Sequence, residues 1–454
     1  MDKIINFEQS LDSFKPSTVV ELLDNYIVGQ EKAKKLLAIA LRNRIRRKYV
    51  SDEMKEEILP KNILMIGPTG VGKTELARRM ALIIDAPFVK VEATKFTERG
   101  YVGRDVEYMI RALVNHSINL VKSRLREKLK GEIEEEVTTY IVDELYQYDN
   151  VRELFPDLKG SKKIKQEIRK GVLKNYFDSF LINIKIKKKN PLFPGIPDFL
   201  PGFDEPAEIN AFFSDLGMGG TEEVKSISVK EAKDILFQEF MDKKVNNDEA
   251  IEIGLKWAQE MGIVFIDEID KISDKAKGYG PEVSREGVQR DLLPIVEGTN
   301  VNTKYGIVKT DHILFIGAGA FHVCKPSDMI PELQGRFPIR VELEKLSKEH
   351  LKRILIEPKN SIIKQYKELL KTEGINLEFE DSAIDKIVEI AENINNKLED
   401  IGARRLHTVM EYLLEEVSFN APDMKVKDFV ITKKYVEERL SSIVDNTSLT
   451  QYIL

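Results

Sequence analysis

The chain has 454 residues, enough for two to four domains, and its 42% hydrophobic and 32% charged content is that of an ordinary soluble globular protein. Its single cysteine, Cys324, excludes an intrachain disulfide and a cysteine-based zinc site. The net charge of −6 argues against an extended nucleic-acid-binding surface, and no apolar run approaches the roughly 18 residues that span a bilayer. With no signal-peptide pattern at the start, we expect a cytoplasmic protein.

Two helices are predicted before the first strand. Pro16 opens the first, with Ser17 or Thr18 as its cap. The second runs from about residue 31 to 49 and ends in a basic run, residues 41–47. These cations are expected to form a solvated face or to favour the negative C-terminal end of the helix, and nucleic-acid contact is the weaker alternative.

Residues 67–74 read Gly-Pro-Thr-Gly-Val-Gly-Lys-Thr, between an apolar run at 63–66 and a helical pattern that starts at Glu75. Strand, glycine-rich loop and helix in this order are the context that a P-loop requires. Lys73 is expected to reach the β- and γ-phosphates of a nucleotide, and Thr74 is expected to bind Mg²⁺. A chance glycine-rich turn is disfavoured because every motif position and both flanks are present.

A second strand is predicted at 87–92, followed by a loop that contains Gly100, Tyr101, Val102 and Gly103. Two glycines around an aromatic and an aliphatic residue indicate a turn that exposes apolar side chains, which usually signals contact with another molecule. The alternative is that Tyr101 folds back onto its own domain. A helix is predicted to follow, because apolar residues recur at helical spacing.

Residues 120–255 are best explained as an insertion, because the next buried strand comes almost 200 positions after the P-loop. Helical patterns occupy 121–136, 162–177 and 229–241, and a proline-rich loop lies at 190–202. No catalytic pattern occurs here. An interaction or gating module and a passive spacer are both open interpretations.

The strand at 262–267 ends in an acidic pair, Asp267 and Glu268. Ligand sites lie at the carboxyl ends of buried parallel strands. Asp267 is therefore expected to hold Mg²⁺, directly or through water, and Glu268 is expected to polarise an attacking water.

The α/β pattern continues with a helix at 284–296 and strands at 311–316 and 339–343, and it stops near Leu346. A mainly helical domain follows. Its expected helices are 347–371, 381–394, 402–419 and 433–444, and its short strand-like pieces are 377–380 and 429–432. The chain ends in an apolar tip, Tyr452, Ile453 and Leu454, which indicates a docking peptide or a segment tucked onto its own domain.

In these motifs the chain resembles the AAA+ ATPases of the Clp/Hsl branch over nearly its whole length. The resemblance rests on residues 27–30, 40–44, 67–74, 91–97, 100–103, 262–271, 331–336 and 402–406, and on the large insertion. It implies an α/β P-loop domain with a five-stranded parallel sheet (residues 1–119 and 256–344), an inserted, mainly helical domain (120–255) and a smaller, mainly helical domain (345–454).

The resemblance also implies a nucleotide site for ATP and Mg²⁺. Val28 matches the position that contacts adenine, and Arg404 matches the sensor-2 arginine. Glu332 lies beside the arginine finger, Arg336, which reaches the γ-phosphate of a neighbouring subunit. The phosphate-binding residues are Gly70, Val71, Gly72, Lys73, Thr74 and Glu75. The place of a polar sensor 1 reads Gly-Ala-Gly at 317–319, so no sensor 1 is assigned.

By the same resemblance, Tyr101 and Val102 grip substrate polypeptide in the pore of a ring of six identical subunits. The tail residues 452–454 dock on an HslV-like threonine peptidase. The expected function is therefore an ATP-driven unfoldase that threads proteins into a partner peptidase and is not itself a peptidase, with no nucleic-acid or membrane partner.

Four alternatives are weighed against this function. A nucleic-acid motor requires a basic stripe. A protease with its own active site could use the zinc motif His-Glu-x-x-His, which the five histidines do not form, or a serine–lysine dyad, which stays open although no feature of the sequence points to one. A ClpX-type unfoldase usually carries a four-cysteine zinc module, which a single cysteine excludes. A scaffold that binds ATP without turnover does not require a catalytic glutamate, so the presence of Glu268 argues against this alternative.

Overall fold

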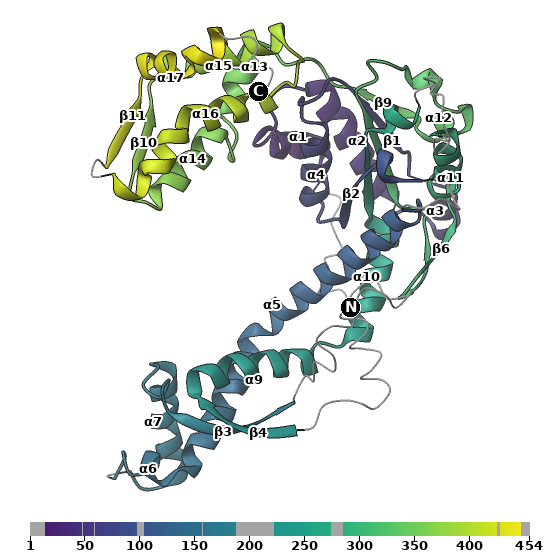
Figure 1. Ribbon diagram of the computed structural model, residues 1–454. Helices are drawn as coiled ribbons and strands as arrows, with labels where there is room; N and C mark the ends of the chain where they lie inside the picture. The colour runs from purple at the N-terminus through teal and green to yellow at the C-terminus, as the bar shows by residue number, and fades with distance from the viewer. Residues whose placement is uncertain are drawn as a thin grey trace. The chain divides into compact units, whose positions relative to one another are not determined.

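The computed structural model describes residues 14–47, 49–58, 60–97, 104–156, 158–187, 222–273, 285–424 and 427–445 (Figure 1). Two compact units divide the chain: residues 1–121 together with 248–454, and residues 122–247. The expected pore loop at 100–103 and the expected docking tail at 452–454 lie outside the described residues.

A five-stranded sheet is the centre of the first unit. It has the order β2-β5-β8-β1-β9, and every neighbouring pair is parallel. The strands are β1 (Ile63–Ile66), β2 (Phe88–Glu92), β5 (Ile263–Asp267), β8 (Leu314–Gly319) and β9 (Ile339–Glu342). The three central strands, β5, β8 and β1, are almost continuously apolar because helices cover parallel sheets on both faces, whereas the edge strands β2 and β9 carry charged residues. The expected sheet is confirmed.

The strand register brings the functional motifs to one edge of this sheet. Ile66 lies opposite Gly319, and Glu92 lies opposite Asp267. Because all five strands are parallel, the P-loop after β1 and the acidic pair after β5 emerge at the same carboxyl edge.

Seven helices of the first unit belong to this α/β part of the described chain. They are α1 (Pro16–Asp24), α2 (Glu31–Arg47), α3 (Asp52–Glu57), α4 (Lys73–Ile83), α10 (Asn247–Met261), α11 (Arg285–Glu297) and α12 (Pro331–Arg336). Helix α10 was not predicted, although Ala250, Gly254, Trp257 and Met261 are buried at helical spacing. An antiparallel pair, β6 (Asn300–Thr303) and β7 (Gly306–Lys309), was also missed.

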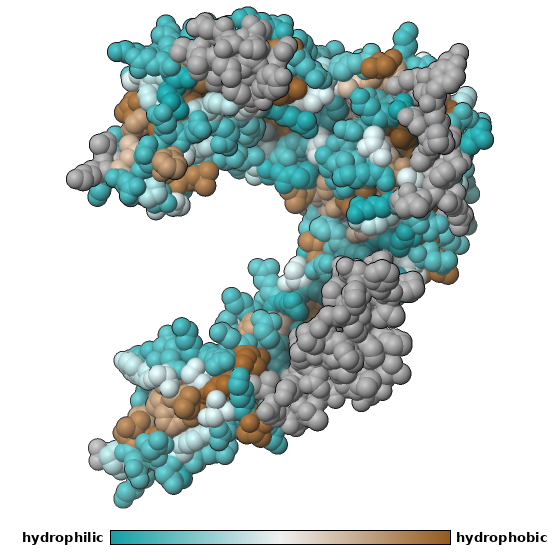
Figure 2. Space-filling view, viewed as in Figure 1, coloured by the Kyte–Doolittle hydropathy of each residue, from teal (hydrophilic) through white to brown (hydrophobic). Residues whose placement is uncertain are grey.

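Helix α5 (Tyr108–Gln147) is 40 residues long, and the second unit begins within it. That unit also contains α6 (Asp149–Arg152), α7 (Ser161–Leu173), the antiparallel pair β3 (Leu181–Lys187) and β4 (Glu222–Ser228), and α9 (Val229–Lys244). Several large apolar side chains of this unit are exposed, and Figure 2 shows brown groups over it. They are Leu154, Leu173, Tyr176, Leu181 and Val224.

A separate hydrophobic core forms in the C-terminal part of the first unit. Its elements are α13 (Lys348–Ile356), α14 (Ile362–Lys371), β10 (Asn376–Phe379), α15 (Asp381–Lys397), α16 (Arg404–Asn420), β11 (Asp428–Ile431) and α17 (Lys433–Asp445). The single helix expected over 347–371 is wrong. Two helices occupy it, because Pro358 lies in the break between them and has no N–H to continue a helix.

Candidate active site

The P-loop begins α4 through two glycines in the left-handed region. Gly70 has φ of +74° and Gly72 has φ of +100°, which few other residues adopt without strain. The ammonium group of Lys73 donates hydrogen bonds to the main-chain oxygens of Gly67 at 2.5 Å and Pro68 at 2.7 Å. The lysine therefore lies along the loop, where phosphate oxygens would replace these carbonyl acceptors.

Oxygen ligands suited to Mg²⁺ meet at the carboxyl edge of the sheet. The hydroxyl of Thr74 lies 3.5 Å from Oδ2 of Asp267, and Lys90 pairs with the same oxygen at 2.8 Å. No group of three or more acidic, histidine or cysteine side chains that could hold a metal occurs among the described residues. This donor set fits Mg²⁺, which usually takes one or two protein oxygens and completes its shell with phosphates and water.

Glu268 follows Asp267 in a backbone conformation that is rare for its residue type. Its φ is +56°, its side chain is exposed, and its N–H donates to Oδ1 of Asp267 at 3.1 Å. A non-glycine residue in the left-handed region costs about 1–3 kcal/mol and is common at functional sites. The turn keeps the carboxylate in solvent at the edge where the P-loop emerges.

Burial lowers the pKa of Lys73. The carboxylates of Asp267 and Asp270 oppose this shift, and the guanidinium of Arg404 adds to it. Arg404 therefore lies close enough for its charge to act on the P-loop lysine. Two cations beside a phosphate-binding loop offset part of the negative charge of a triphosphate.

The P-loop is in direct contact with the segment that opens α16. The N–H of Ala403 donates to the oxygen of Gly70 at 3.1 Å. A Cβ atom on Gly70 would lie 1.9 Å from the oxygen of Ile401, and one on Gly402 would lie 2.9 Å from the oxygen of Thr69. Only glycine allows the two backbones to approach so closely. The two sequence motifs alone did not predict this contact.

The two arginines that open α16 have different roles. Arg405 is 2% exposed and donates to Oδ1 of Asn395 and to the oxygen of Glu399. Arg404 is exposed. Arg405 therefore stabilises the fold, and Arg404 remains available at the P-loop.

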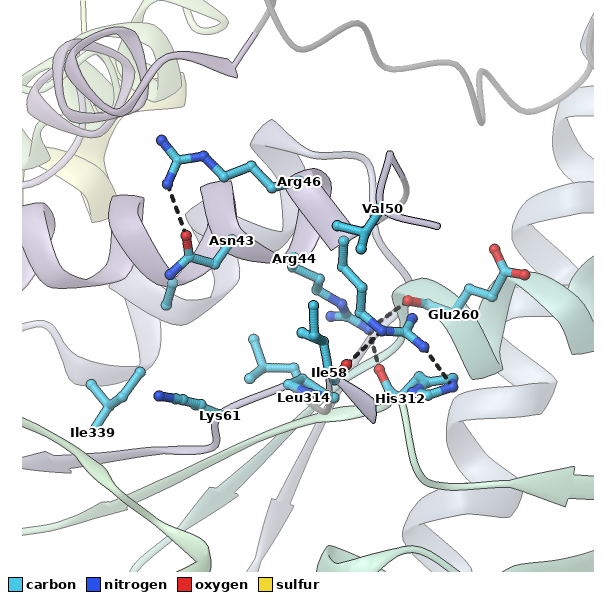
Figure 3. Close-up of a pocket in the computed structure, with 13 residues that line it drawn as sticks. Asn43, Arg44, Arg46, Val50, Ile58, Lys61, Glu260, His312, Leu314 and Ile339 are labelled. Atoms are coloured by element: carbon cyan, nitrogen blue, oxygen red, sulfur yellow. Dashed lines mark hydrogen bonds between the residues drawn. The ribbon is translucent and has the colours of Figure 1, made fainter. Parts of the chain in front are cut away.

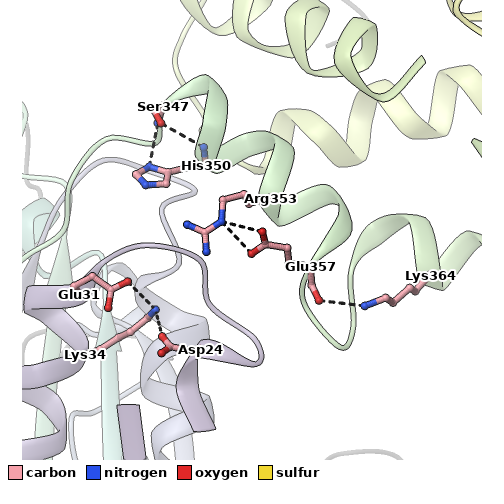
Figure 4. A network of polar contacts seen from close by, with 8 residues as sticks. All are labelled: Asp24, Glu31, Lys34, Ser347, His350, Arg353, Glu357 and Lys364. Carbon is pink, nitrogen blue, oxygen red and sulfur yellow. Dashed lines mark hydrogen bonds and ion pairs between the residues drawn. The ribbon is translucent and has the colours of Figure 1, made fainter. Parts of the chain in front are cut away.

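Val28 is 5% exposed and lies in the loop between α1 and α2. Next to it, the amide of Gln30 donates to the oxygen of Glu344 at 2.8 Å and accepts from its N–H at 2.9 Å. A Cβ atom on Gly29 would lie 3.1 Å from the ring of His350, a residue shown with its capping partner Ser347 in Figure 4. The expected adenine loop therefore contacts the connection between β9 and α13.

Arg336 and Glu332 lie on α12. Both side chains are exposed, and Arg336 bonds to Oε1 of Glu297 through Nε at 2.9 Å and through Nη2 at 2.8 Å. No described contact joins either residue to the P-loop of the same chain. The amide of Asn62 donates to the main-chain oxygen of Arg336 at 3.1 Å, which holds the end of α12 against the sheet.

Asp270 is a site residue that the sequence motifs did not reveal. It is 7% exposed, and its Oδ2 accepts from the N–H of Phe321 at 3.2 Å, just beyond the β8 exit where no sensor 1 was assigned. Its charge acts on Lys73. The signal in the sequence that could have identified Asp270 is its position three residues after Asp267, which places it at the same end of the sheet.

A five-stranded parallel sheet with a P-loop after one strand and an acidic pair after another defines an ATPase of the AAA+ class. Two family matches agree: residues 62–158 match the AAA domain (dynein-related subfamily), and residues 205–340 match the AAA domain (Cdc48 subfamily). The chain is therefore an ATPase.

Sequence comparison with similar proteins identifies the family within the AAA+ class. The chain is 50% identical to the ATP-dependent protease ATPase subunit HslU of Persephonella marina, covering 98% of this chain and 100% of that protein. It is 50% identical to HslU of Syntrophomonas wolfei, with 97% and 99% covered, and 48% identical to HslU of Thermoanaerobacter sp., with 98% and 100% covered. The chain belongs to the HslU family. The resemblance to the Clp/Hsl branch is confirmed.

Among the described helices, none combines the length and the apolar character needed to cross a membrane.

Proposed function

We propose that this protein is a cytoplasmic, ATP-driven unfoldase that forms a homo-hexameric ring and threads unfolded polypeptides into an HslV-like threonine peptidase, which it activates. The proposal is supported by its membership of the HslU family, whose relatives are ATPase subunits of ATP-dependent proteases. Nucleic acid and membranes have no part in it.

Substrate ATP is held by the P-loop. Backbone N–H groups of residues 70–75 and the start of α4 bind its phosphates, and Lys73 leaves the carbonyls of Gly67 and Pro68 for phosphate oxygens. Thr74 and Asp267 would hold Mg²⁺, which neutralises phosphate charge when bound. Val28 borders the base, and Arg404 adds positive charge from α16.

Water is the acceptor of the phosphoryl group. Glu268 orients the water and accepts a proton from it. The oxygen of the water bonds to the γ-phosphorus while the bond from the γ-phosphorus to ADP breaks. Arg336, with Glu332 beside it, acts on the site of the neighbouring subunit. Its pairing with Glu297 on its own chain, away from its own P-loop, supports a role between subunits.

The contact of the P-loop with α16 is the observation that carries the coupling of hydrolysis to movement. Gly70 bonds to Ala403, and Arg404 follows at once. Loss of the γ-phosphate therefore changes the charge that α16 and the C-terminal helices experience. A rotation near Leu346 would move the Tyr101 loop along the pore.

The test is degradation of a stably folded protein by a Tyr101→Ala variant mixed with an HslV-type peptidase and ATP. We expect basal ATP hydrolysis to stay within about twofold and degradation to be lost, because truncation removes the grip and leaves the nucleotide site intact. Tyr101→Phe should keep activity. Tyr176→Ala, at a tyrosine that is 74% exposed in the second unit, is the matched control. Normal degradation by Tyr101→Ala would refute the pore-loop role.

A further inference from the structure

Buried charged side chains connect main-chain segments at both edges of the sheet. At the amino edge, the basic end of α2 is not a solvated face: Arg44 is 7% exposed, and its Nη2 donates to the main-chain oxygens of Glu260 and His312, each at 2.9 Å (Figure 3). This arginine lies at the edge opposite the P-loop and stabilises the fold. At the carboxyl edge, the buried carboxylate of Asp270 connects segments that surround the nucleotide site.

Glu268 lies in a turn that needs support from the residues around it. Its φ of +56° is costly for a residue with a side chain, and such a conformation persists only where neighbouring contacts hold it. The side chain of Glu268 is exposed and gives little support itself. On one side, Asp267 ends β5 and accepts the N–H of Glu268. On the other side lies the short 3₁₀ turn η3 (Ile269–Ile272), which contains Asp270.

The η3 turn is fixed to the strand β8 and to the segment that follows it. Oδ2 of Asp270 accepts the N–H of Phe321 at 3.2 Å, just beyond the end of β8. The main-chain oxygen of Asp270 accepts from Sγ of Cys324 at 3.3 Å. Ile269 is fully buried, and a Cβ atom on Gly317 would lie 3.1 Å from its Cδ1. Two hydrogen bonds and one apolar contact therefore hold the turn that follows Glu268.

The segment after β8 has a rare conformation of its own. Phe321 has φ of +53°, which is unusual for a bulky residue. A Cβ atom on Gly319 would lie 2.7 Å from the ring of Phe321 and 2.8 Å from Oδ1 of Asp270, so both side chains pack closely over the end of the strand. The oxygen of Gly319 accepts the N–H of Gly67, the first residue of the P-loop, at 3.2 Å. Asp270 thus connects the turn beside Glu268 to the β8 exit, which is bonded to the P-loop.

We propose that Asp270 is a positioning residue for ATP hydrolysis: by holding η3 against the β8 exit, it keeps Glu268 in the left-handed turn at the edge where the P-loop emerges. This role of Asp270 rests on the proposed role of Glu268 as the base. The carboxylate acts here as a hydrogen-bond acceptor, so an uncharged acceptor of the same shape should replace it. The charge of Asp270 also acts on Lys73, and the test has to separate the two effects.

The first test removes the acceptor from the full-length protein with Asp270→Ala. We expect kcat for ATP hydrolysis to fall roughly 10- to 100-fold, because a small displacement of a catalytic group has effects of this size, and we expect the affinity for a fluorescent ATP analogue to weaken by no more than about threefold. Thr310→Val is the matched control. The buried hydroxyl of Thr310 accepts the N–H of Thr299 at 2.9 Å before the amino end of β8, and its loss should change neither quantity.

Two conservative variants separate the hydrogen bond from the charge. Asp270→Asn keeps an oxygen for the N–H of Phe321 and removes the charge, so kcat should stay within about threefold of the original value. Asp270→Glu keeps the charge but lengthens a buried side chain by a methylene, so it should lose kcat as the alanine variant does. An asparagine variant as slow as the alanine variant would overturn the proposal, because the charge would then be what matters.

The double variant Asp270→Ala/Glu268→Gln tests whether Asp270 acts through Glu268. Its rate of phosphate release should equal that of Glu268→Gln alone within about twofold, since a base that is already lost cannot be displaced. A further loss in the double variant, or a normal kcat in Asp270→Ala, would overturn the positioning role and leave the proposed base in place. A normal rate in Glu268→Gln would overturn the proposed base and the positioning role together.

Discussion

Glu268 and Arg336 stand on different elements of one chain, and the proposed chemistry needs them in different subunits. Glu268 follows the last residue of β5, Asp267, whereas Arg336 ends α12 and pairs with Glu297. If each P-loop site takes its base, Glu268, from its own chain and its arginine finger, Arg336, from a neighbouring chain, a variant that lacks the base and a variant that lacks the finger can complement each other.

We expect Glu268→Gln alone to lower the rate of ATP hydrolysis at least about 10²-fold with nucleotide binding retained. We expect Arg336→Ala alone to lower it about 10³-fold or more. Mixing the two variants should restore part of the rate, because some subunit boundaries then join an intact base to an intact finger. Phosphate release measures this. A mixture as inactive as its parents would place Arg336 in its own subunit's site.

His312 gives a prediction about pH. Burial and Arg47 hold its folded pKa below the usual value of 6.5, so the unfolded chain binds more protons than the folded chain below about pH 6.5. The free energy of unfolding therefore falls as the pH drops through that value towards the folded pKa. His312→Gln should show a smaller fall between pH 7 and pH 5.5 in urea titrations. An unchanged slope would contradict a buried neutral imidazole.

At the scale of elements, the backbones of the P-loop and of the segment that opens α16 are in direct contact, and glycine makes this close approach possible. A methyl group on Gly70 would meet the oxygen of Ile401 at 1.9 Å, and its φ of +74° strains any L-residue. The two segments must separate to accept it. The expected coupling between the nucleotide and the C-terminal helices depends on this contact.

We expect Gly70→Ala to weaken ATP binding and to lower the thermal midpoint, because the loop and the α16 segment are forced apart. Gly131→Ala is the matched control: this glycine lies within α5, and a Cβ atom there would meet no heavy atom within 4 Å. It should raise the stability by about 0.5–1 kcal/mol, since alanine favours helix over glycine. Differential scanning fluorimetry with and without ATP compares them, and equal behaviour would rule out the close approach.

At the scale of the whole molecule, the proposed assembly depends on the tail at residues 452–454. Its proposed docking role rests on the resemblance to the Clp/Hsl branch, and the apolar tip after a polar segment is the signal in the sequence. The tail is remote in sequence from every residue of the nucleotide site, so its removal should separate peptidase activation from ATP hydrolysis.

Removing Tyr452, Ile453 and Leu454 should abolish activation of an HslV-type peptidase on a small peptide substrate and leave basal ATP hydrolysis unchanged. A peptide substrate needs no unfolding, so the assay reports docking alone. Replacing Ser448 and Gln451 by alanine changes the same segment without removing its apolar tip and should keep activation. Full activation by the truncated protein would show that docking uses another surface.

The sequence alone determined the nucleotide-binding class and most of the fold. A P-loop is a local motif. Continuous apolar residues indicate that strands such as Ile63–Ile66 and Ile263–Asp267 are buried. Parallel pairing then brings their carboxyl ends together without further information. The break at Pro358 could also have been read, since proline ends helices.

Only the tertiary structure decided what depends on contacts between distant residues. Gly70 requires Gly402 because two backbones meet there, and Asp270 is tied to Phe321 across the sheet. Arg44 and Arg47 are ordinary surface cations by sequence pattern, yet the fold buries them against main-chain oxygens and His312. Periodicity reports which side of a helix is apolar, but it does not report which charged residues find buried partners.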